Sequence, residues 1–284
     1  MQNLSVEDTH FTESPLNING NLIDFKIPKI MGILNITDDS FYEKSRIDSD
    51  VQLLTQAEKM LSEGATFLDL GAMSTRPNAL KVVLNLEQKR IKQSVSSIKK
   101  EFPTALISID TFRSEIAQCG IDEGASMIND ISGFNFDSKL LEVVSRNKVA
   151  YVLMHSKGNL KTMHDSHLYE NLTQEVINYF HEKVEILIQS GVYSIILDPG
   201  FGFSKNLEQN YELLNQMNRI KILERPILAG LSRKSMIYKK LGISPENSLN
   251  GTTALNAFAL AEGASILRVH DVAPATEIIK MLYA

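Results

Sequence analysis

Carboxylate and amide side chains stand at the ends of several short apolar runs in the sequence. Asp110 and Asp198 close two of these runs, and Asn129 lies at the end of a third. Carboxylates accept hydrogen bonds and an amide both donates and accepts them, so the three suit a flat heterocycle that carries N–H donors. Two-point contacts of this kind would fix the orientation of a planar ring. They predict a heterocyclic ligand.

Donors and positive charges follow other apolar runs. They are Asn35, Arg76, Arg268 and His270. Residues 232–235 (SRKS) are expected to open a helix, whose free N–H groups and dipole favour an anion. A single polar residue after a strand is most often an ordinary solvated loop residue, but here polar residues follow all eight apolar runs. The pattern therefore predicts one shared site for a phosphorylated or carboxylated substrate.

The histidines between these runs have competing interpretations. His164 and His167 have a spacing that a metal site could use. No cysteine, third histidine or HExxH pattern accompanies them, so we interpret both as solvated loop residues and predict no zinc site. His155 follows a strand, where a pocket residue and a hydrogen-bonded core histidine are equally good interpretations.

Cys119 is the only cysteine in the chain. It excludes an intrachain disulfide and a cysteine-based metal cluster, and on its helical face we interpret it as a buried small hydrophobe. Phe201 and Phe203 follow an Asp-Pro-Gly turn, where an aromatic ring can plug a barrel mouth or lie on a ligand ring. From the residues alone we favour plugging for both.

Eight short runs rich in β-branched residues alternate with helical patterns of ten or more residues, which is typical of parallel βα units. The predicted strands are Ile30–Leu34, Thr66–Leu70, Ala105–Ile109, Met127–Asp130, Ala150–Met154, Ser194–Leu197, Pro226–Ala229 and Ser265–Val269. They are nearly continuous apolar runs, as burial on both faces requires. Eight units in about 250 residues favour a closed (β/α)8 TIM barrel over a doubly wound open sheet, which would show the same alternation.

The predicted helices have apolar positions three and four residues apart, the spacing of one stripe against a sheet. The clearest are Val51–Glu63, Leu86–Lys100, Ser138–Arg146 and Leu172–Gln189. Glycines expected in the left-handed C′ position end four helices just before a strand; they are Gly64, Gly124, Gly191 and Gly263. In such a barrel the reacting groups gather at the C-terminal ends of the strands, where the polar residues described above lie.

We divide the chain into a flexible N-terminal tail, residues 1–15, and one barrel domain, residues 16–284. The segment Leu16–Ile27 alternates around an Asn-Gly pair, which is a hairpin turn signal, and we expect it to cover the bottom of the barrel. The longest expected internal loop is Ser156–Glu170, between the fifth strand and its helix.

Composition excludes several broad classes of function. The 284 residues are 43% hydrophobic and 22% charged, as in an ordinary globular protein. A formal net charge of −5 and the lack of a Lys/Arg block argue against nucleic-acid binding, which depends on clustered cations. The sequence shows no secretory signal and no apolar segment of about 18 residues. We therefore expect a cytoplasmic protein with small-molecule partners and no membrane association.

Seven segments together resemble the motifs of one family, the dihydropteroate synthases. In chain order they are MGILNIT from residue 31, STRP from 74, IDT from 109, INDISG from 128, LDPGFGF from 197, SRKS from 232 and RVHDV from 268. Each motif is weak alone, but the combination is specific, and the resemblance runs from about residue 16 to residue 284. It implies a TIM-barrel transferase that joins a pterin diphosphate to p-aminobenzoate in folate biosynthesis.

The resemblance also implies roles for individual residues. The implied pterin site is Asp110, Asn129, Asp198, Lys234 and Arg268. The implied diphosphate site is Asn35, Thr75, Arg268 and His270, with Asn35 as a ligand of Mg²⁺. The implied p-aminobenzoate site is Thr75, Arg76, Pro77, Phe203, Lys234 and Ser235. Lys234, Arg268 and Asp110 are the implied catalytic residues of a dissociative substitution without a nucleophilic side chain, in a homodimer formed through C-terminal helices and targeted by sulfonamides.

The sequence departs from the family in loops that are expected to close over the second substrate. The departures are Asp38 for a proline, residues 42–44 (YEK) for a flexible stretch, Ala72 and Met73 for a Gly-Glu pair, and Asn78 and Ser204 for glycines. None of these positions is assigned to bond making. The departures concern binding of the aromatic amine more than the pterin site.

Two other functions share the expected fold. A pterin-dependent methyltransferase domain needs no diphosphate site, so the STRP, SRKS and RVHD segments argue against it, and no cobalamin-binding segment is recognisable. A non-catalytic pterin-binding homologue is compatible with the altered loops, and turnover would exclude it.

Overall fold

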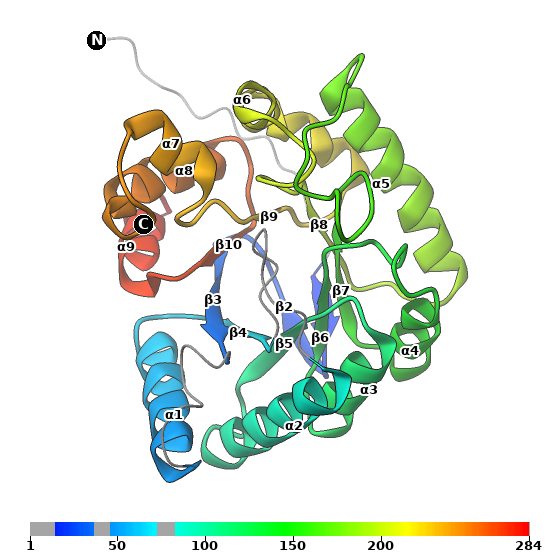
Figure 1. Ribbon diagram of the computed structural model, residues 1–284, viewed down its shortest axis with the longest axis vertical. Coiled ribbons are helices and arrows are strands. Elements are labelled where there is room, and N and C mark those ends of the chain that lie inside the picture. Colours follow the sequence, from blue (N-terminus) through cyan, green and yellow to red (C-terminus); the bar gives the residue numbers. More distant parts are fainter. Residues whose placement is uncertain (1–14, 37–45, 73–82, 284) are drawn as a thin grey trace.

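The computed structural model describes residues 15–36, 46–72 and 83–283, the side chains of residues 46–49 excepted. Its eight parallel strands are β3 (Lys29–Asn35), β4 (Phe67–Gly71), β5 (Leu106–Asp110), β6 (Met127–Asp130), β7 (Ala150–Met154), β8 (Ile195–Asp198), β9 (Leu228–Ala229) and β10 (Ile266–Val269). They pair in the order β8-β7-β6-β5-β4-β3-β10-β9, and a bridge between Leu197 and Ile227 joins the two ends. The strands therefore form the predicted barrel, seen end-on in Figure 1.

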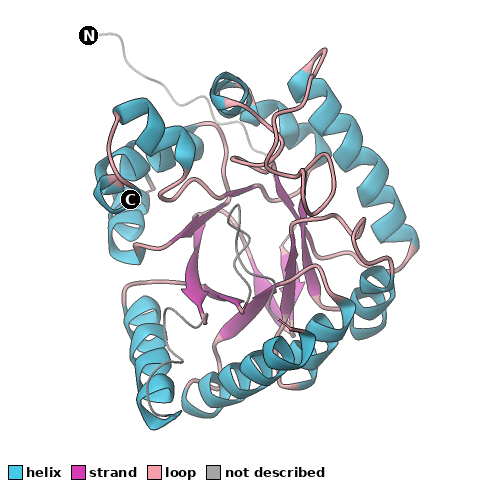
Figure 2. Cartoon of the chain, in the orientation of Figure 1, coloured by secondary structure: helices cyan, strands magenta, loops and turns pink. Residues whose placement is uncertain are grey.

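Helices surround the barrel on its outside (Figure 2). They are α1 (Arg46–Ser62), α2 (Leu84–Glu101), α3 (Ser114–Asp122), α4 (Lys139–Asn147), α5 (Leu172–Gln189), α6 (Leu207–Asn215), α7 (Ser235–Leu241), α8 (Leu249–Ala261) and α9 (Val272–Leu282), with 3-10 segments at Met217–Leu223 and Pro245–Asn247. The four clearest predicted helices are confirmed. The predicted strands are confirmed to within two residues at each end.

The interior of the barrel is filled from alternate strand positions. One buried cluster contains Met31, Phe67, Leu106, Met127, Ile196, Leu228 and Ile266. Side chains alternate between the two faces of a strand, so residues two or four positions further along each strand share this inward face. Those residues are Asn35, Asp69, Asp110, Asn129, Asp198 and Arg268. The polar site therefore lies inside the barrel, above its apolar layer.

A two-stranded hairpin closes the opposite end of the barrel. It consists of β1 (Leu16–Ile18) and β2 (Asn21–Ile23), and its turn residues have φ of 52° at Asn19 and 81° at Gly20. Positive φ at both residues gives the turn that a right-twisted hairpin favours. Three of its side chains belong to the interior cluster: Leu16, Ile18 and Phe25. The expected cover at the bottom of the barrel is confirmed.

Four glycines end helices in the way that the sequence predicts. Their φ angles lie between 86° and 109°, in the left-handed region, at Gly64, Gly124, Gly191 and Gly263. A side chain would strain this conformation, so glycine lets the chain turn from helix into strand. Within the described ranges, every helix is too short or too polar to cross a bilayer. Most of the predicted N-terminal tail, residues 1–14, lies outside the described residues.

Candidate active site

Arg268 is the centre of a buried network at the C-terminal ends of the strands. Its Nε donates to Asp69 Oδ2 and its Nη2 to Asp110 Oδ2, each at 2.7 Å. Asn129 Nδ2 donates to the same Asp69 oxygen at 3.0 Å. Asp69 is fully buried, and its Oδ1 has no hydrogen-bond partner within the described part of the chain. The Arg268 guanidinium thus holds the carboxylates of Asp69 and Asp110, and Asp69 in turn orients the amide of Asn129.

Asp198 and Lys234 lie beside this network. Asp198 is buried, and its Oδ1 accepts a hydrogen bond from the Gly200 N–H at 2.8 Å. Lys234 donates from Nζ to the carbonyl oxygen of Phe201. A Cβ atom at Gly230 would stand 3.7 Å from this ammonium. The lysine ammonium therefore lies close to the backbone at the end of β9.

Burial is the largest influence on the ionisation of these groups. It raises the pKa of Asp110 to about 7 against the attraction of Arg268, and Asp69 adds to the rise. It lowers the pKa of Lys234 to about 8 against the attraction of Asp198, whose own pKa burial raises. Burial also acts to lower the pKa of Arg268, but Asp69 and Asp110 outweigh it and the net shift is upward. A permanent cation therefore lies near two groups, Asp110 and Lys234, whose pKa values are close to neutrality, as at many functional sites.

The raised pKa of Asp110 predicts how stability depends on pH. Its carboxyl group has an ordinary pKa of 3.8 and a folded-state pKa of about 7. Between these values the folded protein still binds the proton that the unfolded chain has lost, so this group lowers stability as pH rises through the interval. We expect Asp110→Asn to remove part of that decline. Urea unfolding of both ligand-free proteins from about pH 4.5 to about pH 7.5 gives the free energy of unfolding of each at every pH. If the two free energies fell by the same amount over this range, the raised pKa of Asp110 would be contradicted.

A hydroxyl–imidazole pair and an ion pair connect the loop after β9 with the end of β10. Ser232 Oγ lies 2.9 Å from His270 Nδ1, and it accepts a hydrogen bond from the backbone N–H of His270 at 3.2 Å. Arg233 pairs with Asp271 through Nε to Oδ2 at 2.9 Å and Nη2 to Oδ1 at 2.8 Å. This bidentate contact joins the loop after β9 to the end of β10. It holds Lys234, the residue that precedes α7, beside the strand that carries Arg268.

Asn35 lies at the end of β3, next to Gly71 on β4. A Cβ atom at Gly71 would stand 3.6 Å from Asn35 Oδ1 and 3.8 Å from Asp110 Oδ2, so the glycine leaves these two oxygens beside one space. An amide oxygen is a suitable ligand for Mg²⁺, which takes few protein ligands when phosphates are present. In the described ranges, groups of three or more His, Cys, Asp or Glu that could hold a metal are absent. The Asn35 amide oxygen would therefore fit as a single protein ligand of Mg²⁺.

Phe201 and Phe203 have different environments. Phe201 is fully buried in the core between the sheet and the helices, so it does not plug the barrel mouth and its predicted plugging role is wrong. Phe203 is partly exposed, packs against the buried cluster that contains Met154 and Met163, and has its ring centroid 5.1 Å from Lys234 Nζ; its plugging role stays a prediction. Gly202, with φ of 81°, turns the chain between the two rings. One ring therefore enters the core, and the other is partly exposed beside Lys234.

His155 is a core histidine rather than a pocket residue. It is buried, its Nδ1 lies 3.1 Å from Lys205 Nζ, and burial holds its pKa well below the usual value. Lys205 also donates to the carbonyl oxygens of Gly200 and Phe203, each at 3.2 Å. Burial lowers the pKa of this lysine to about 7. Sequence reasoning missed Lys205, because nothing in its neighbours distinguishes it from a surface lysine.

Asp69 was also missed, although the sequence contains a signal for it. It stands between two leucines inside a continuous apolar run, where a buried strand accepts a charge only if that charge is paired.

Asp130 has the opposite orientation to its neighbour Asn129. It accepts from the Ser132 and Phe134 N–H groups at 2.8 and 2.6 Å and from Tyr151 OH at 2.6 Å. Asp130 therefore shapes the loop after β6 instead of lining the site.

Several predicted site residues lie outside the described residues. They are Thr75, Arg76 and Pro77, together with the departures Asp38, residues 42–44, Met73 and Asn78. The roles expected of Thr75, Arg76 and Pro77 stay predictions. Ser235 is the first residue of α7, which confirms that the SRKS segment opens a helix.

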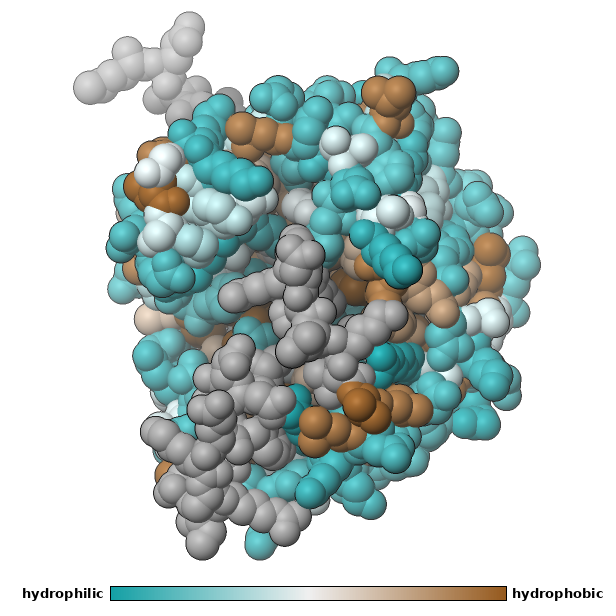
Figure 3. All heavy atoms as spheres, viewed as in Figure 1, coloured by the Kyte–Doolittle hydropathy of each residue, from teal (hydrophilic) through white to brown (hydrophobic). Residues whose placement is uncertain are grey.

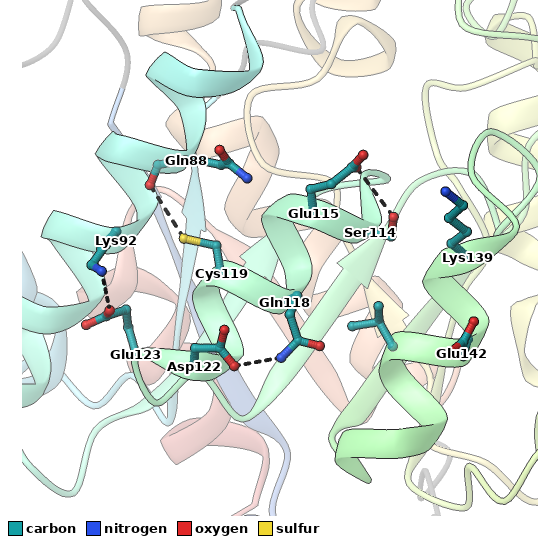
Figure 4. Close-up of a pocket in the computed structure, with 11 residues that line it drawn as sticks. Gln88, Lys92, Ser114, Glu115, Gln118, Cys119, Asp122, Glu123, Lys139 and Glu142 are labelled. Atoms are coloured by element: carbon teal, nitrogen blue, oxygen red, sulfur yellow. Dashed lines mark hydrogen bonds and ion pairs between the residues drawn. The ribbon is translucent and has the colours of Figure 1, made fainter.

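A surface hollow of about 480 Å³ lies between α2, α3 and α4, away from this site (Figure 4). Among the residues that line it, Lys92 pairs with Glu123 at 3.5 Å and Gln118 Nε2 donates to Asp122 Oδ1 at 2.6 Å. Cys119 lines the hollow and is only partly buried, so the interpretation of it as a buried small hydrophobe is wrong. Its Sγ lies 3.7 Å from the Gln88 carbonyl oxygen of α2. Burial, with help from Glu123, raises the pKa of this thiol, the reverse of what an activated nucleophile requires.

The fold and the buried array define a (β/α)8-barrel enzyme that binds a flat heterocycle beside an anion. The chain matches the pterin binding enzyme family over residues 31–270. It is 37% identical over 267 residues to the dihydropteroate synthase of Escherichia coli strain K12, covering 93% of this chain and 94% of that protein. The chain belongs to the dihydropteroate synthase family, whose members are transferases of folate biosynthesis.

Two solved structures show the same likeness in three dimensions. The Yersinia pestis dihydropteroate synthase in complex with a sulfonamide drug superposes with a TM-score of 0.87 at 35% identity, covering 94% of this chain and 97% of that one. The Xanthomonas albilineans enzyme with 4-aminobenzoic acid gives a TM-score of 0.87 at 32% identity, covering 95% and 97%. The function of the chain is therefore that of a dihydropteroate synthase, as its sequence motifs predict.

Proposed function

We propose that the barrel mouth condenses 6-hydroxymethyl-7,8-dihydropterin diphosphate with p-aminobenzoate to give 7,8-dihydropteroate and diphosphate. The observation that carries this proposal is the buried array in which Arg268 bridges Asp69 and Asp110 beside Asn129. Acceptors for the ring and a permanent cation for the diphosphate thus occur together.

Asp110, Asn129 and Asp198 hold the pterin in this proposal. Both carboxylates can accept hydrogen bonds from ring N–H groups, and the Asn129 amide, whose Nδ2 donates to Asp69, can accept through its Oδ1. The planar guanidinium of Arg268 and the ammonium of Lys234 complete the site. Because the acceptors are buried, their hydrogen bonds to the ring are stronger than the same bonds in water.

Arg268 and His270 bind the diphosphate, together with Asn35 and Thr75. Ser232 fixes the imidazole of His270, and its contact with Nδ1 at 2.9 Å sets the orientation of the ring. Asn35 is the protein ligand of Mg²⁺. When bound, the ion neutralises negative charge on the leaving diphosphate.

The aromatic amine lies against Phe203 and Lys234, with Ser235, Thr75, Arg76 and Pro77 as the other expected contacts. A cation 5.1 Å from an aromatic ring suits a ligand that has both an aromatic ring and a carboxylate. The Xanthomonas albilineans relative was solved with 4-aminobenzoic acid, which has this chemistry.

The reaction is a substitution at the methylene carbon of the pterin. The carbon–oxygen bond breaks, its electron pair leaves with the diphosphate, and the pterin ring spreads the positive charge. The amine nitrogen then bonds to the carbon and loses a proton. Asp110 and Asp198 stabilise the cationic ring, Lys234 positions it, and Arg268 stabilises the leaving group. No step uses a nucleophilic side chain.

Release of diphosphate from the pterin substrate tests this proposal. We expect release that depends on both p-aminobenzoate and Mg²⁺, with 7,8-dihydropteroate formed in equal amount. Binding of the pterin without turnover would instead identify a non-catalytic pterin-binding homologue. Release of diphosphate without formation of 7,8-dihydropteroate, when p-aminobenzoate is present, would contradict the condensation.

His270→Ala is expected to separate the two parts of the first substrate. Loss of a hydrogen bond to a charged group costs about 1.5–3 kcal/mol, so affinity for the pterin diphosphate should fall about 10- to 150-fold. Affinity for a hydroxymethylpterin without phosphates should change by less than about twofold, because His270 contacts only the anion in this proposal. Titration calorimetry with both ligands measures the difference, and equal losses would refute it.

We also propose that two copies of the chain associate through the C-terminal helices. Exposed large apolar side chains gather there: Leu241, Ile243, Leu249, Phe258, Met281, Leu282 and Tyr283. Figure 3 shows hydrophobic side chains over the α7 and α8 region of one face. Surfaces of this kind mark interaction sites. Sedimentation should show a dimer, and Phe258→Glu, on the exposed side of α8, should give a monomer.

A further inference from the structure

Two loops at the barrel mouth form one continuous wall. The loop between β7 and α5 and the loop between β8 and α6 are joined through Ser204. Its N–H donates to the Met163 carbonyl oxygen at 2.8 Å, and its own carbonyl oxygen accepts from the His167 N–H at 3.2 Å. Gln209 Nε2 adds a hydrogen bond to the His167 carbonyl oxygen at 3.0 Å. Residues 163–167 are therefore held by the neighbouring loop, while Asp165 and Ser166 between the two histidines are exposed.

Ser204 itself is held by a side-chain contact. It has φ of 51°, a left-handed conformation that is strained for a residue with a side chain, and it is fully buried. Its Oγ lies 3.1 Å from Tyr169 OH, which also donates to the Ser204 carbonyl oxygen at 3.2 Å. The position that resembles a family glycine thus carries a hydroxyl that ties the long loop to the turn after β8.

Lys205 fixes the same turn from beneath. Its ammonium has three donors, and three acceptors surround it: His155 Nδ1 at 3.1 Å and the carbonyl oxygens of Gly200 and Phe203 at 3.2 Å. The backbone of Phe203 is therefore held in place. What remains to be fixed is the orientation of its ring.

His164 packs against that ring. The imidazole stacks on Phe203 with ring centroids 5.0 Å apart and planes 29° apart. The preceding residue, Met163, is buried in a cluster with Phe112, Ile131 and Met154, so the backbone that carries the histidine is anchored. His164 and His167 are loop residues of intermediate exposure, as the prediction of solvated loop residues requires in part, but tertiary contacts also hold both.

We propose that His164 is a positioning residue for the aromatic amine, acting through Phe203. Its ring holds the phenylalanine in the plane against which the second substrate packs, beside Lys234. This inference rests on the proposed function, because it concerns the amine subsite of the same reaction. It predicts that His164 affects the aromatic amine and leaves the pterin diphosphate unaffected.

Steady-state kinetics of His164→Ala and His164→Phe test the inference. A stacked aromatic pair contributes enough that its loss should raise KM for p-aminobenzoate about 2- to 10-fold. KM for the pterin diphosphate should be unchanged. His164→Phe keeps the stack and should restore the wild-type KM. His181→Ala, which removes an exposed histidine of α5, is the matched control and should change neither constant.

The outcomes separate the two proposals. Wild-type protein without p-aminobenzoate-dependent release of diphosphate would overturn the proposed function and this inference with it. Normal wild-type turnover with an unchanged KM in His164→Ala would overturn only the role of His164. Equal rises in KM for both substrates, or failure of His164→Phe to rescue, would also overturn it. Thermal unfolding of each variant shows whether the fold is kept.

Discussion

Arg268→Ala is expected to lower turnover by at least about 100-fold, because it removes the cation that stabilises the leaving diphosphate. It also leaves Asp69 and Asp110 without the guanidinium that contacts each at 2.7 Å. Removing one partner of a buried ion pair costs about 3–5 kcal/mol. We therefore expect a large fall in the free energy of unfolding at pH 8 and a smaller one at pH 5, where Asp110 is protonated.

Arg268→Lys is the variant that keeps the charge. A lysine ammonium is a compact point charge and cannot reproduce the two-sided contact of a planar guanidinium. It should recover much of the stability and little of the turnover. Urea unfolding at both pH values and the diphosphate-release assay give the two readouts. If Arg268→Lys restored full activity, the geometry of the guanidinium would not be what the reaction requires.

Asp198→Asn is expected to weaken pterin binding by about 10- to 150-fold or more, since loss of a charged hydrogen-bond acceptor costs about 1.5–3 kcal/mol. The buried carboxylate of Asp198 also attracts Lys234, so its loss weakens a second contact to the ring. The fold should remain intact, because an asparagine Oδ1 can still accept the hydrogen bond from Gly200.

Calorimetric titration of a hydroxymethylpterin into the variant and the wild type measures this loss. Asp24→Asn, at the exposed hairpin on the opposite end of the barrel, is the matched control and should bind normally. Thermal unfolding confirms the fold. Unchanged pterin affinity in Asp198→Asn would remove this carboxylate from the site.

The order and bounds of the barrel elements follow from local patterns in the sequence. β6, β7 and α5 match their predicted bounds at both ends, because apolar runs and helical stripes each reflect burial that repeats along the chain. The left-handed glycine after α1 was predictable for a similar reason, since the steric restriction belongs to the residue itself. Barrel closure was favoured by the number of units and decided by the Leu197–Ile227 bridge.

Asp110, Asn129 and Asp198 were predictable as site residues because parallel strands bring their C-terminal ends to the same side of a barrel. Their exact roles in this chain needed the family resemblance. The alternation of side chains also places them on the inward face once Leu106, Met127 and Ile196 are known to be inside. The sequence shows that such alternation exists, but it does not show which face is which in a strand buried on both sides.

The partners within the site were decided only by the tertiary structure. Arg268 contacts Asp69 across 199 positions of the chain, and a contact at that separation leaves no local pattern. The same holds for the stack of His164 on Phe203 and for the three contacts of Lys205. The sequence by itself determines which strand ends carry polar side chains to the mouth of the barrel. Which of them pair there depends on the closure of the sheet and the path of the loops, because pairing requires proximity in space.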